Sequence, residues 1–566
     1  MKTELSKEHI NAVNRRRRII INYDTCCTFQ HFKGDLGKLF DQYTYFLDDK
    51  GSQVDAIFWN WTDGNIAVYP SKYLPVVSEM EDCVDRLFDG IEEINEGYPL
   101  TDQDKQKALT IIKAYKEWWN NGIIPMKVFL EETKKRGLEA FFSYRINGAT
   151  NDFGPLIKSV ILQSHPDWGL PVPYNNGALN FKEQGVRDLK LNILKEVAEN
   201  FDYDGIELDF ARCPPFLPPG HQWENRDILT DFVRSVRIML LEVEKKRGRP
   251  FLLAARIAEN IEGNHFDGLD VETWMEESLI DIFVLGNRSF EVDIQGFRYA
   301  AKDKDIKFYP CYDTHHAPDG YMEPPIEIYR GAAANWLKQG ADGICAFNFR
   351  NIKGIYKNVG SQLLPERQVY LEAGSLDTLM YKEKIFVVQR RGGGHGAEVV
   401  PNAEDWTTPR LLYANTNMLS QLPVKLQTDG KADTMLEIYA ADNVKAYADK
   451  VEKIYLRLLL SQSSAEGMPD ERRLEKVLVA RIGHANNRLY NIPPVSGIEE
   501  HIEIRLNNIL LYKATVDKGW LIYEVQPKQL ATGNNLIGIR IIEQQTDMSD
   551  EITIEKLEIH VKYNAC

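Results

Sequence analysis

The sequence lacks the features of a membrane-spanning, disulfide-stapled or nucleic-acid-binding protein. No apolar run approaches the roughly 18 residues that a membrane-spanning helix needs. The seven cysteines include no Cys-x-x-Cys pair, so we expect reduced thiols. Lys and Arg number 68 against 83 Asp and Glu, and this net charge of −15 argues against nucleic acid or an anionic membrane as the main partner. The glycine-rich tract 390–396 lacks the Lys-Ser/Thr of a phosphate loop, and no cofactor is expected.

The N-terminal residues also lack the pattern of a signal peptide, in which basic, apolar and small residues follow one another. We therefore expect a cytoplasmic protein, or an exported one whose leader has been removed. The sequence does not predict an oligomeric state.

In the first two thirds of the chain, strand-like runs alternate with helical patterns. Eight apolar runs of strand length are separated by helical patterns, which is typical of an α/β fold closed as a (β/α)₈ TIM barrel. In one intervening helix, Phe232, Val236, Met239 and Val243 recur on one face, and Gly248 follows as a C-terminal cap. We assign residues 1–365 to the barrel, with strands at 18–24, 56–61, 138–147, 204–210, 251–257, 280–287, 307–313 and 342–349.

The pattern changes near residue 370, where alternating runs separated by turn residues replace the helical periods. This predicts an antiparallel β-sandwich domain over residues 366–566. The runs lie at 453–460, 476–482, 501–511, 520–525, 535–542 and 552–563. Such a domain either braces the barrel or binds carbohydrate.

The carboxyl ends of the barrel strands predict where the chemistry takes place. In the fourth strand, Ile206, Leu208 and Phe210 share one face, so Glu207 and Asp209 point into the lumen. Asp209, one residue from the strand end, is the first catalytic candidate. Glu207 lies one layer deeper, either as a catalytic group or in a buried ionic layer with the lumen arginines. Asp313, which ends the seventh strand, is the candidate second carboxylate, with Glu323, Glu259, Asp24 and Glu224 as rivals.

Polar groups end the other strands too, and a purely structural barrel would not need them. Amides, arginines and aromatic rings suit the hydroxyl pairs and ring faces of a sugar. The predicted substrate-binding residues are Asn22, Asp24, Asn60, Trp61, Arg145, Asn147, Arg212, His221, Arg256, Asn287, Tyr312, His315 and Asn348. No metal is expected, because the His315-His316 pair has no second cluster at ligand spacing.

Two tracts also resemble a known group of proteins. GALNFKEQGVRDLKLNILKEVAENFDYDGIELDF and ENRDILTDFVRSVRIMLLEVEKKRGRPFLLAARI resemble bacterial glycosyl-hydrolase-like (family 10-like) barrel proteins that carry a C-terminal β-sandwich. The tract LNNILLYKATVDKGWLIYEVQPKQLATGNNLIGIRI is similar to the sandwich part of those chains. The resemblance implies a carbohydrate-active barrel in which the strand-four acid, here Asp209, is catalytic.

The leading hypothesis is a glycoside hydrolase that acts on a plant, algal or microbial glycan. Such enzymes use two carboxyl groups across one bond, here Asp209 as general acid/base and Asp313 as nucleophile or base. The lumen arginines Arg145 and Arg256 would suit an anionic sugar. Two alternatives remain open: a metal-assisted sugar isomerase, epimerase or lyase, and a barrel that binds glycan without cleaving it.

Overall fold

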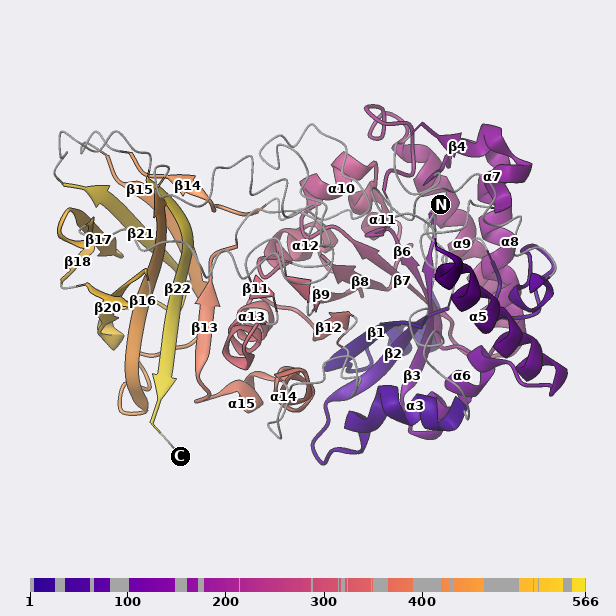
Figure 1. Cartoon of the computed structure of the whole chain (residues 1–566), viewed down its shortest axis with the longest axis horizontal. Coiled ribbons are helices and arrows are strands. Elements are labelled where there is room, and N and C mark those ends of the chain that lie inside the picture. Colours follow the sequence, from indigo (N-terminus) through magenta and orange to yellow (C-terminus); the bar gives the residue numbers. More distant parts are fainter. Residues whose placement is uncertain are drawn as a thin grey trace.

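The structure is a computed structural model of the whole chain. It describes residues 5–25, 36–61, 66–81, 101–147, 160–171, 178–212, 214–286, 289–313, 315–316, 321–322, 324–347, 349, 365–389, 419–427, 432–462, 498–512, 514–517, 519–542 and 552–564. A barrel and a β-sandwich stand side by side along the long axis (Figure 1).

Eight parallel strands close into a barrel in the order β1-β12-β9-β8-β7-β6-β3-β2. Each coincides with one of the eight predicted runs, so the (β/α)₈ prediction is confirmed. The strands are β1 (Ile19–Asp24), β2 (Val54–Asn60), β3 (Glu139–Arg145), β6 (Gly205–Asp209), β7 (Leu252–Ile257), β8 (Ile282–Leu285), β9 (Lys307–Asp313) and β12 (Ile344–Phe347).

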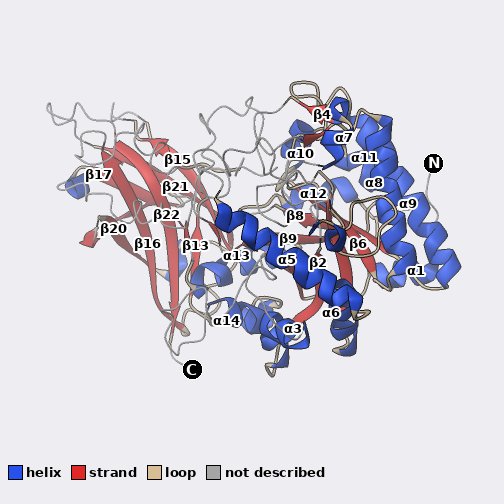
Figure 2. Cartoon of the chain, turned by 45° about the vertical axis from the view of Figure 1, so that its right-hand side comes forward, coloured by secondary structure: helices blue, strands red, loops and turns tan. Residues whose placement is uncertain are grey.

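Helices surround the strands (Figure 2). They are α1 (Lys7–Val13), α3 (Leu36–Thr44), α5 (Asp102–Asn120), α6 (Pro125–Lys135), α7 (Val160–Ser164), α8 (Gln184–Asn200), α9 (Arg226–Arg247), α10 (Ile261–Asp267), α11 (Val271–Glu276), α12 (Ile294–Ala301), α13 (Ile326–Lys338), α14 (Pro365–Glu372) and α15 (Leu376–Leu379). As predicted, α9 buries Phe232, Val236, Met239 and Val243 and ends at Gly248, whose φ of 69° is left-handed. None of the helices in the described part of the chain has both the length and the hydropathy of a bilayer-spanning helix.

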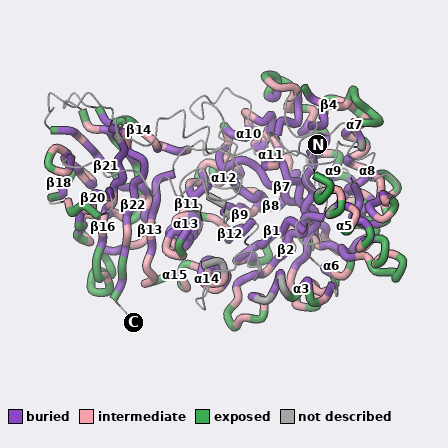
Figure 3. Tube along the Cα trace, in the orientation of Figure 1, coloured by how far each residue is buried: buried purple, intermediate pink, exposed green. Residues whose placement is uncertain are grey.

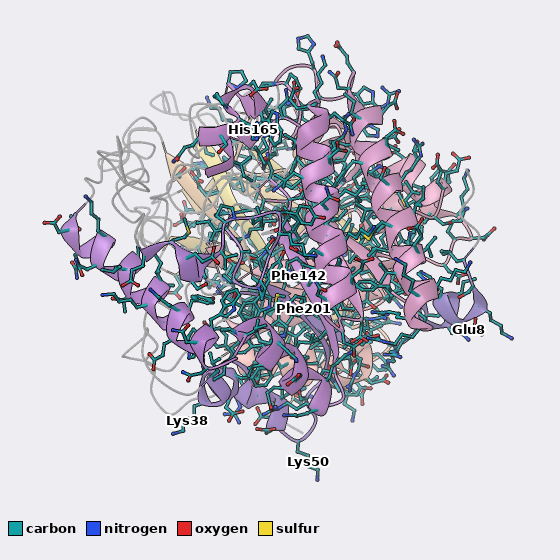
Figure 4. All side chains as sticks on the ribbon, turned by 90° about the vertical axis from the view of Figure 1, so that its right-hand side faces the viewer. Glu8, Lys38, Lys50, Phe142, His165 and Phe201 are labelled. Carbon is teal, nitrogen blue, oxygen red and sulfur yellow. The ribbon has the colours of Figure 1, made fainter. Side chains whose placement is uncertain are left out.

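The barrel strands are buried on both faces, as the continuous purple of Figure 3 shows. Inward-facing residues such as Ile20, Phe58, Phe141 and Val284 fill the lumen as a cluster of their own. Outward-facing residues join the helix layer, as Phe142 of β3 does, labelled in the end-on view of Figure 4. The period-two assignment of faces from the sequence therefore holds along these strands.

A short helix, α1, closes the end of the barrel at which the strands begin. Its Val13 belongs to the lumen cluster. Its His9 is fully buried, with Nδ1 at 2.7 Å from Glu244 Oε2 and Nε2 at 3.0 Å from Asp281 Oδ1. The two carboxylates also accept hydrogen bonds from backbone N–H groups at the start of β7: Glu244 from Phe251, just before the strand, and Asp281 from Leu253, its second residue. The histidine thereby fixes α1 to the barrel floor.

The C-terminal part forms two antiparallel sheets, as predicted. One contains β13 (Lys384–Val387), β14 (Val424–Lys425), β16 (Val451–Gln462), β19 (Thr515–Asp517), β20 (Trp520–Val525) and β22 (Ile552–Tyr563). The other contains β15 (Thr434–Ala440), β17 (Ile502–Leu506), β18 (Ile509–Leu511) and β21 (Gly533–Ile541). Two further two-stranded pairs lie in barrel loops: β4 (Gly169–Leu170) with β5 (Ala178–Leu179), and β10 (His315–His316) with β11 (Tyr321–Met322).

One predicted sandwich strand is wrong in detail. The run 501–511 is a hairpin of β17 and β18, because Asn507 and Asn508 adopt φ values of 51° and 66°. Two left-handed residues form the tight turn that matches strand twist, and asparagine tolerates this conformation. The predicted run 476–482 lies outside the described residues.

The sandwich is joined to the barrel through α13. Gly331 lets β13 approach so closely that a Cβ there would stand 2.2 Å from the carbonyl oxygen of Ile385. Asn335 donates to the carbonyl of Tyr439 at 2.9 Å and accepts from the N–H of Ala441 at 3.0 Å. The helix–strand layer and the sandwich interior share one contiguous apolar cluster. The sandwich therefore packs directly against the barrel through α13.

Candidate active site

An aspartate lies between two arginines at the carboxyl end of the barrel. Arg145, Asp209 and Arg256 occupy the same level of the adjacent strands β3, β6 and β7. Arg256 donates to Asp209 twice, from Nε to Oδ1 at 3.0 Å and from Nη2 to Oδ2 at 2.5 Å. The N–H of Ala211 donates to the same Oδ1 at 3.1 Å. Paired, parallel bonds of this kind suit an ionised carboxylate.

A second carboxylate meets this cluster from β1. Asp24 forms a short ion pair with Nη2 of Arg145, whose Nε lies 4.0 Å from Asp209 Oδ2. The carboxylates of Asp24 on β1 and Asp209 on β6 thus both lie beside the guanidinium of Arg145 on β3. Asn60, which pairs with Asp24 across the strands, lies at the same end and donates to the carbonyl of Ser143 at 3.3 Å.

Glu207 lies one layer below this cluster, as predicted, and is fully buried. Its Oε2 accepts from the Ser143 hydroxyl at 2.5 Å and from the Asn22 amide at 2.6 Å. Its Oε1 and the Asn22 Oδ1 have no hydrogen-bond partner among the described residues. Burial raises the pKa of Glu207, the charge of Arg256 opposes the shift, and the charge of Asp209 adds to it, for a value of about 7. The arginines pair with Asp209 and Asp24 instead of building an ionic layer directly on Glu207.

Three of the predicted substrate contacts are structural, which corrects the expectation from the sequence. Trp61 packs outside the barrel, edge to face with Phe129 at 5.1 Å. Tyr312 also faces the helices and stacks on Trp336 at 5.1 Å. Both residues alternate with lumen-facing residues along the chain, so their rings point outward and pack in the outer layer. The amide of Asn147 donates to the carbonyl of Pro215 and accepts from the N–H of Leu179, which ties two loops together.

The remaining predicted contacts lie further out or outside the description. His221 is exposed and pairs with Glu224 at 2.9 Å, and Arg212 is half-buried just beyond β6. Asn287 and Asn348 lie outside the described residues, as do the side chains of Asp313 and His315, although the backbone of Asp313 ends β9 beside Phe347. Their assignment to the site stays a prediction. Within the described ranges, no three His, Cys, Asp or Glu side chains come together as a metal-ligand set.

Two further residues were not among the predicted site residues. Ser143 faces the lumen, as the alternation of side chains along β3 predicts, and its hydroxyl donates a hydrogen bond to Glu207. Glu291 follows β8 near the sandwich, and burial raises its pKa to about 8, with the charge of Glu437 adding to the shift. No periodicity marks a residue in such a connecting segment, so the sequence held no signal for it.

A surface hollow lies elsewhere, on the outside of the barrel. It has a volume of about 1330 Å³ and runs along the outer wall between α5, α6 and α8, where Lys134 and Asp202 line it near the strand beginnings. Barrel enzymes place their chemistry at the opposite end. The Asp209 cluster, and not this hollow, is therefore the candidate site.

The fold and this cluster define a (β/α)₈ barrel with a carboxylate–guanidinium site and an attached β-sandwich. No protein-family model and no curated protein sequence matches the chain. Among solved structures, it is similar to α-L-fucosidase isoenzyme 2 from Paenibacillus thiaminolyticus, with 13% identity over 64% of this chain and 48% of that one, at a TM-score of 0.36. The chain thus spans about half the length of that fucosidase.

Two other solved structures are similar at the same level. The PgaB (BpsB) glycoside hydrolase domain from Bordetella bronchiseptica shares 12% identity over 64% of this chain and 99% of that one, at a TM-score of 0.37. The GH36 α-galactosidase AgaA from Geobacillus stearothermophilus shares 11% identity over 100% of this chain and 57% of that one, at a TM-score of 0.31. Likeness this remote concerns the fold alone.

Proposed function

We propose that this protein is a glycoside hydrolase whose reaction takes place at the carboxyl end of the barrel. The single observation that supports it most is the pair of carboxylates, Asp24 and Asp209, that flank the guanidinium of Arg145 in a buried lumen. Hydrolysis of a glycosidic bond needs two carboxyl groups that face one bond. Burial of two acids in one lumen is unfavourable unless they are paired or used.

The contacts of Asp209 favour one of the two roles. Arg256 donates to both of its oxygens, an arrangement that orients a carboxylate. Asp209 would accordingly serve as the nucleophile or base, in place of the general acid/base role inferred from the sequence. The proton donor would be a second carboxyl group, for which Asp313 at the end of β9 is the sequence-based candidate and Asp24 the one with described contacts.

The described contacts give less support to an anionic substrate. Both lumen arginines pair with carboxylates of the chain itself, Arg145 with Asp24 and Arg256 with Asp209. The cluster has no excess positive charge to offer a uronic acid or a sulfate. We therefore propose a neutral glycan as the substrate class.

The saturated contacts of Asp209 are also what a barrel without turnover would contain, so binding without cleavage is the second candidate. The two are separated by assaying the wild type and Asp209→Asn on aryl glycosides and on neutral, uronic and sulfated glycans. The expected result is turnover of a neutral substrate and a loss of about 10²–10⁴-fold in the variant, the range for a group that acts in the chemical step.

The matched control is Asp227→Asn, which changes an exposed aspartate in the first turn of α9 and should keep full activity. Adding azide to Asp209→Gly then tests the role. If Asp209 is a nucleophile, azide should restore turnover and give a glycosyl azide of inverted anomeric configuration. Full activity in a folded Asp209→Asn variant would reject the assignment, and the absence of turnover on every substrate would favour the binding barrel.

A further inference from the structure

A pocket of about 640 Å³ opens in the sandwich, away from the barrel. It is lined from both sheets, by Ile502 of β17, by Leu511 of β18 and by Tyr523 of β20. These strands lie on the side of the sandwich that is farthest from the barrel (Figure 1). The pocket is therefore separate from the Asp209 cluster.

Two residues of the pocket lining each carry a buried polar atom without a partner among the described residues. The hydroxyl of Tyr523 and Oε2 of Glu499 make no hydrogen bond to any described residue. Tyr523 is only 2% exposed, and Glu499 belongs to the short helix Ile498–Glu500 at the pocket wall. Burial, and then the nearby charge of Glu499, raises the pKa of Tyr523 to about 12. Leaving such groups unsatisfied is unfavourable, so a ligand that hydrogen-bonds them is favoured.

The rim of the pocket is apolar and exposed. Tyr512 is 75% exposed and Val516 is 45% exposed, and both line the opening. An aromatic ring beside buried hydrogen-bonding groups suits a ligand with an apolar face and several hydroxyls. Glu500 also lines it, and its charge disfavours an anionic ligand, whereas the charge of Glu503 is paired with Arg505 and Arg540. A neutral sugar residue has this combination of properties.

We propose that this pocket is a second carbohydrate-binding site, which takes a neutral sugar residue of a glycan chain. The sugar packs on Tyr512 and hydrogen-bonds Glu499 and Tyr523. The choice of sugar as ligand rests on the proposed function, and the site would hold the protein on a polymer while the barrel acts on it.

The test uses affinity electrophoresis of the full-length protein in gels that contain xylan, galactomannan, mixed-linkage β-glucan or polygalacturonate. We expect at least one neutral polymer to retard the protein and the anionic polygalacturonate not to do so. Tyr523→Phe removes one hydroxyl and Glu499→Gln removes one charge without a change of shape. Each should weaken retardation about tenfold, the loss typical of one or two hydrogen bonds. Tyr512→Ala should weaken it as well, while the control Tyr299→Ala, at an 87% exposed tyrosine on α12, should not.

The outcomes separate this proposal from the proposed function. Variants of the pocket should keep wild-type turnover of a small aryl glycoside, and Asp209→Asn should keep wild-type retardation. Retardation that is unchanged by all three pocket variants, or no retardation by any neutral polymer, overturns the second site even if the barrel is an active hydrolase. Pocket-dependent retardation with no turnover supports the second site and counts against the hydrolase.

Discussion

Arg256 holds Asp209 by two hydrogen bonds between adjacent strands, and neither side chain is more than 1% exposed. The central carbon of the Arg256 guanidinium also lies over the Phe347 ring, 3.9 Å from the ring centre, and this contact restricts the guanidinium. The carboxylate is thus oriented by a partner that is itself immobilised. An acid that must attack or stabilise a sugar carbon needs this kind of support, because small displacements of reacting groups slow a reaction severely.

Arg256→Lys should reduce activity by more than it reduces stability. Lysine keeps the charge but cannot reproduce the two parallel bonds, so Asp209 loses its fixed orientation. We expect kcat to fall about 10- to 100-fold, with a smaller change in KM, and Arg256→Ala to destabilise the fold by about 3–5 kcal/mol because it leaves a buried charge unpaired. Steady-state kinetics and thermal unfolding measure the two effects. Equal kcat in wild type and Arg256→Lys would mean that orientation by Arg256 is irrelevant to the chemistry.

Glu207 should make the protein less stable as pH rises. Its folded pKa of about 7 lies above its ordinary value of 4.5, so the folded state holds the proton more tightly than the unfolded state. Stability that is present below about pH 4.5 is then lost as pH rises through about 7. Glu207→Gln removes this loss, and its melting temperature relative to wild type should climb between pH 4.5 and pH 7.

The control for that measurement is Glu224→Gln, at an exposed position in the loop after β6. Parallel pH profiles for wild type and Glu207→Gln would show that Glu207 has the same pKa in the folded and unfolded states, contrary to the expectation.

His9 should act on stability in a higher pH window. Burial lowers its pKa and the charge of Arg237 lowers it further, but hydrogen bonds to Asp281 and Glu244 raise it more strongly, to about 9. The protonated form therefore stabilises the fold fully below pH 6.5, and the contribution is lost as pH rises through about 9. His9→Gln should lower the melting temperature most near pH 6 and least near pH 9.5. His265→Gln, at a surface pair with Glu272, is the comparison, and a pH-independent deficit in His9→Gln would contradict the argument.

Gly331→Ala should loosen the junction between the barrel and the sandwich. Alanine gains about 1 kcal/mol of helix propensity, but its Cβ would stand 2.2 Å from a backbone oxygen of β13, which must then move. We expect a net destabilisation of about 1–3 kcal/mol, measured by thermal unfolding. A higher melting temperature in this variant would show that β13 can move away from the added Cβ at little cost in free energy.

The barrel was predictable because its strands carry strong local signals. Alternation placed Asp209, Arg145 and Arg256 in the lumen correctly, since strand parity follows from backbone geometry alone. The cap of α9 at Gly248 was equally readable, because few residues adopt a left-handed φ.

What could not be predicted depends on contacts between distant residues. The period-two rule itself places Trp61 on the outer face, where it packs against Phe129, so its assignment as a substrate contact did not follow from strand alternation. The partner of each arginine was also open, because a lumen offers several carboxylates at similar depth. The run 501–511 can be taken as one strand only if the Asn507-Asn508 pair is passed over, and these two residues form the turn of the hairpin.

The contact between α1 and the barrel floor has a consequence for how the chain is made. His9 leaves the ribosome 272 residues before Asp281, the acid that anchors it. During most of the barrel's synthesis, the floor is open and Val13 has no lumen to enter. The first helix therefore cannot dock until the chain has been made past β8, which ends at Leu285. A chaperone that shields this helix until then would help the chain to fold.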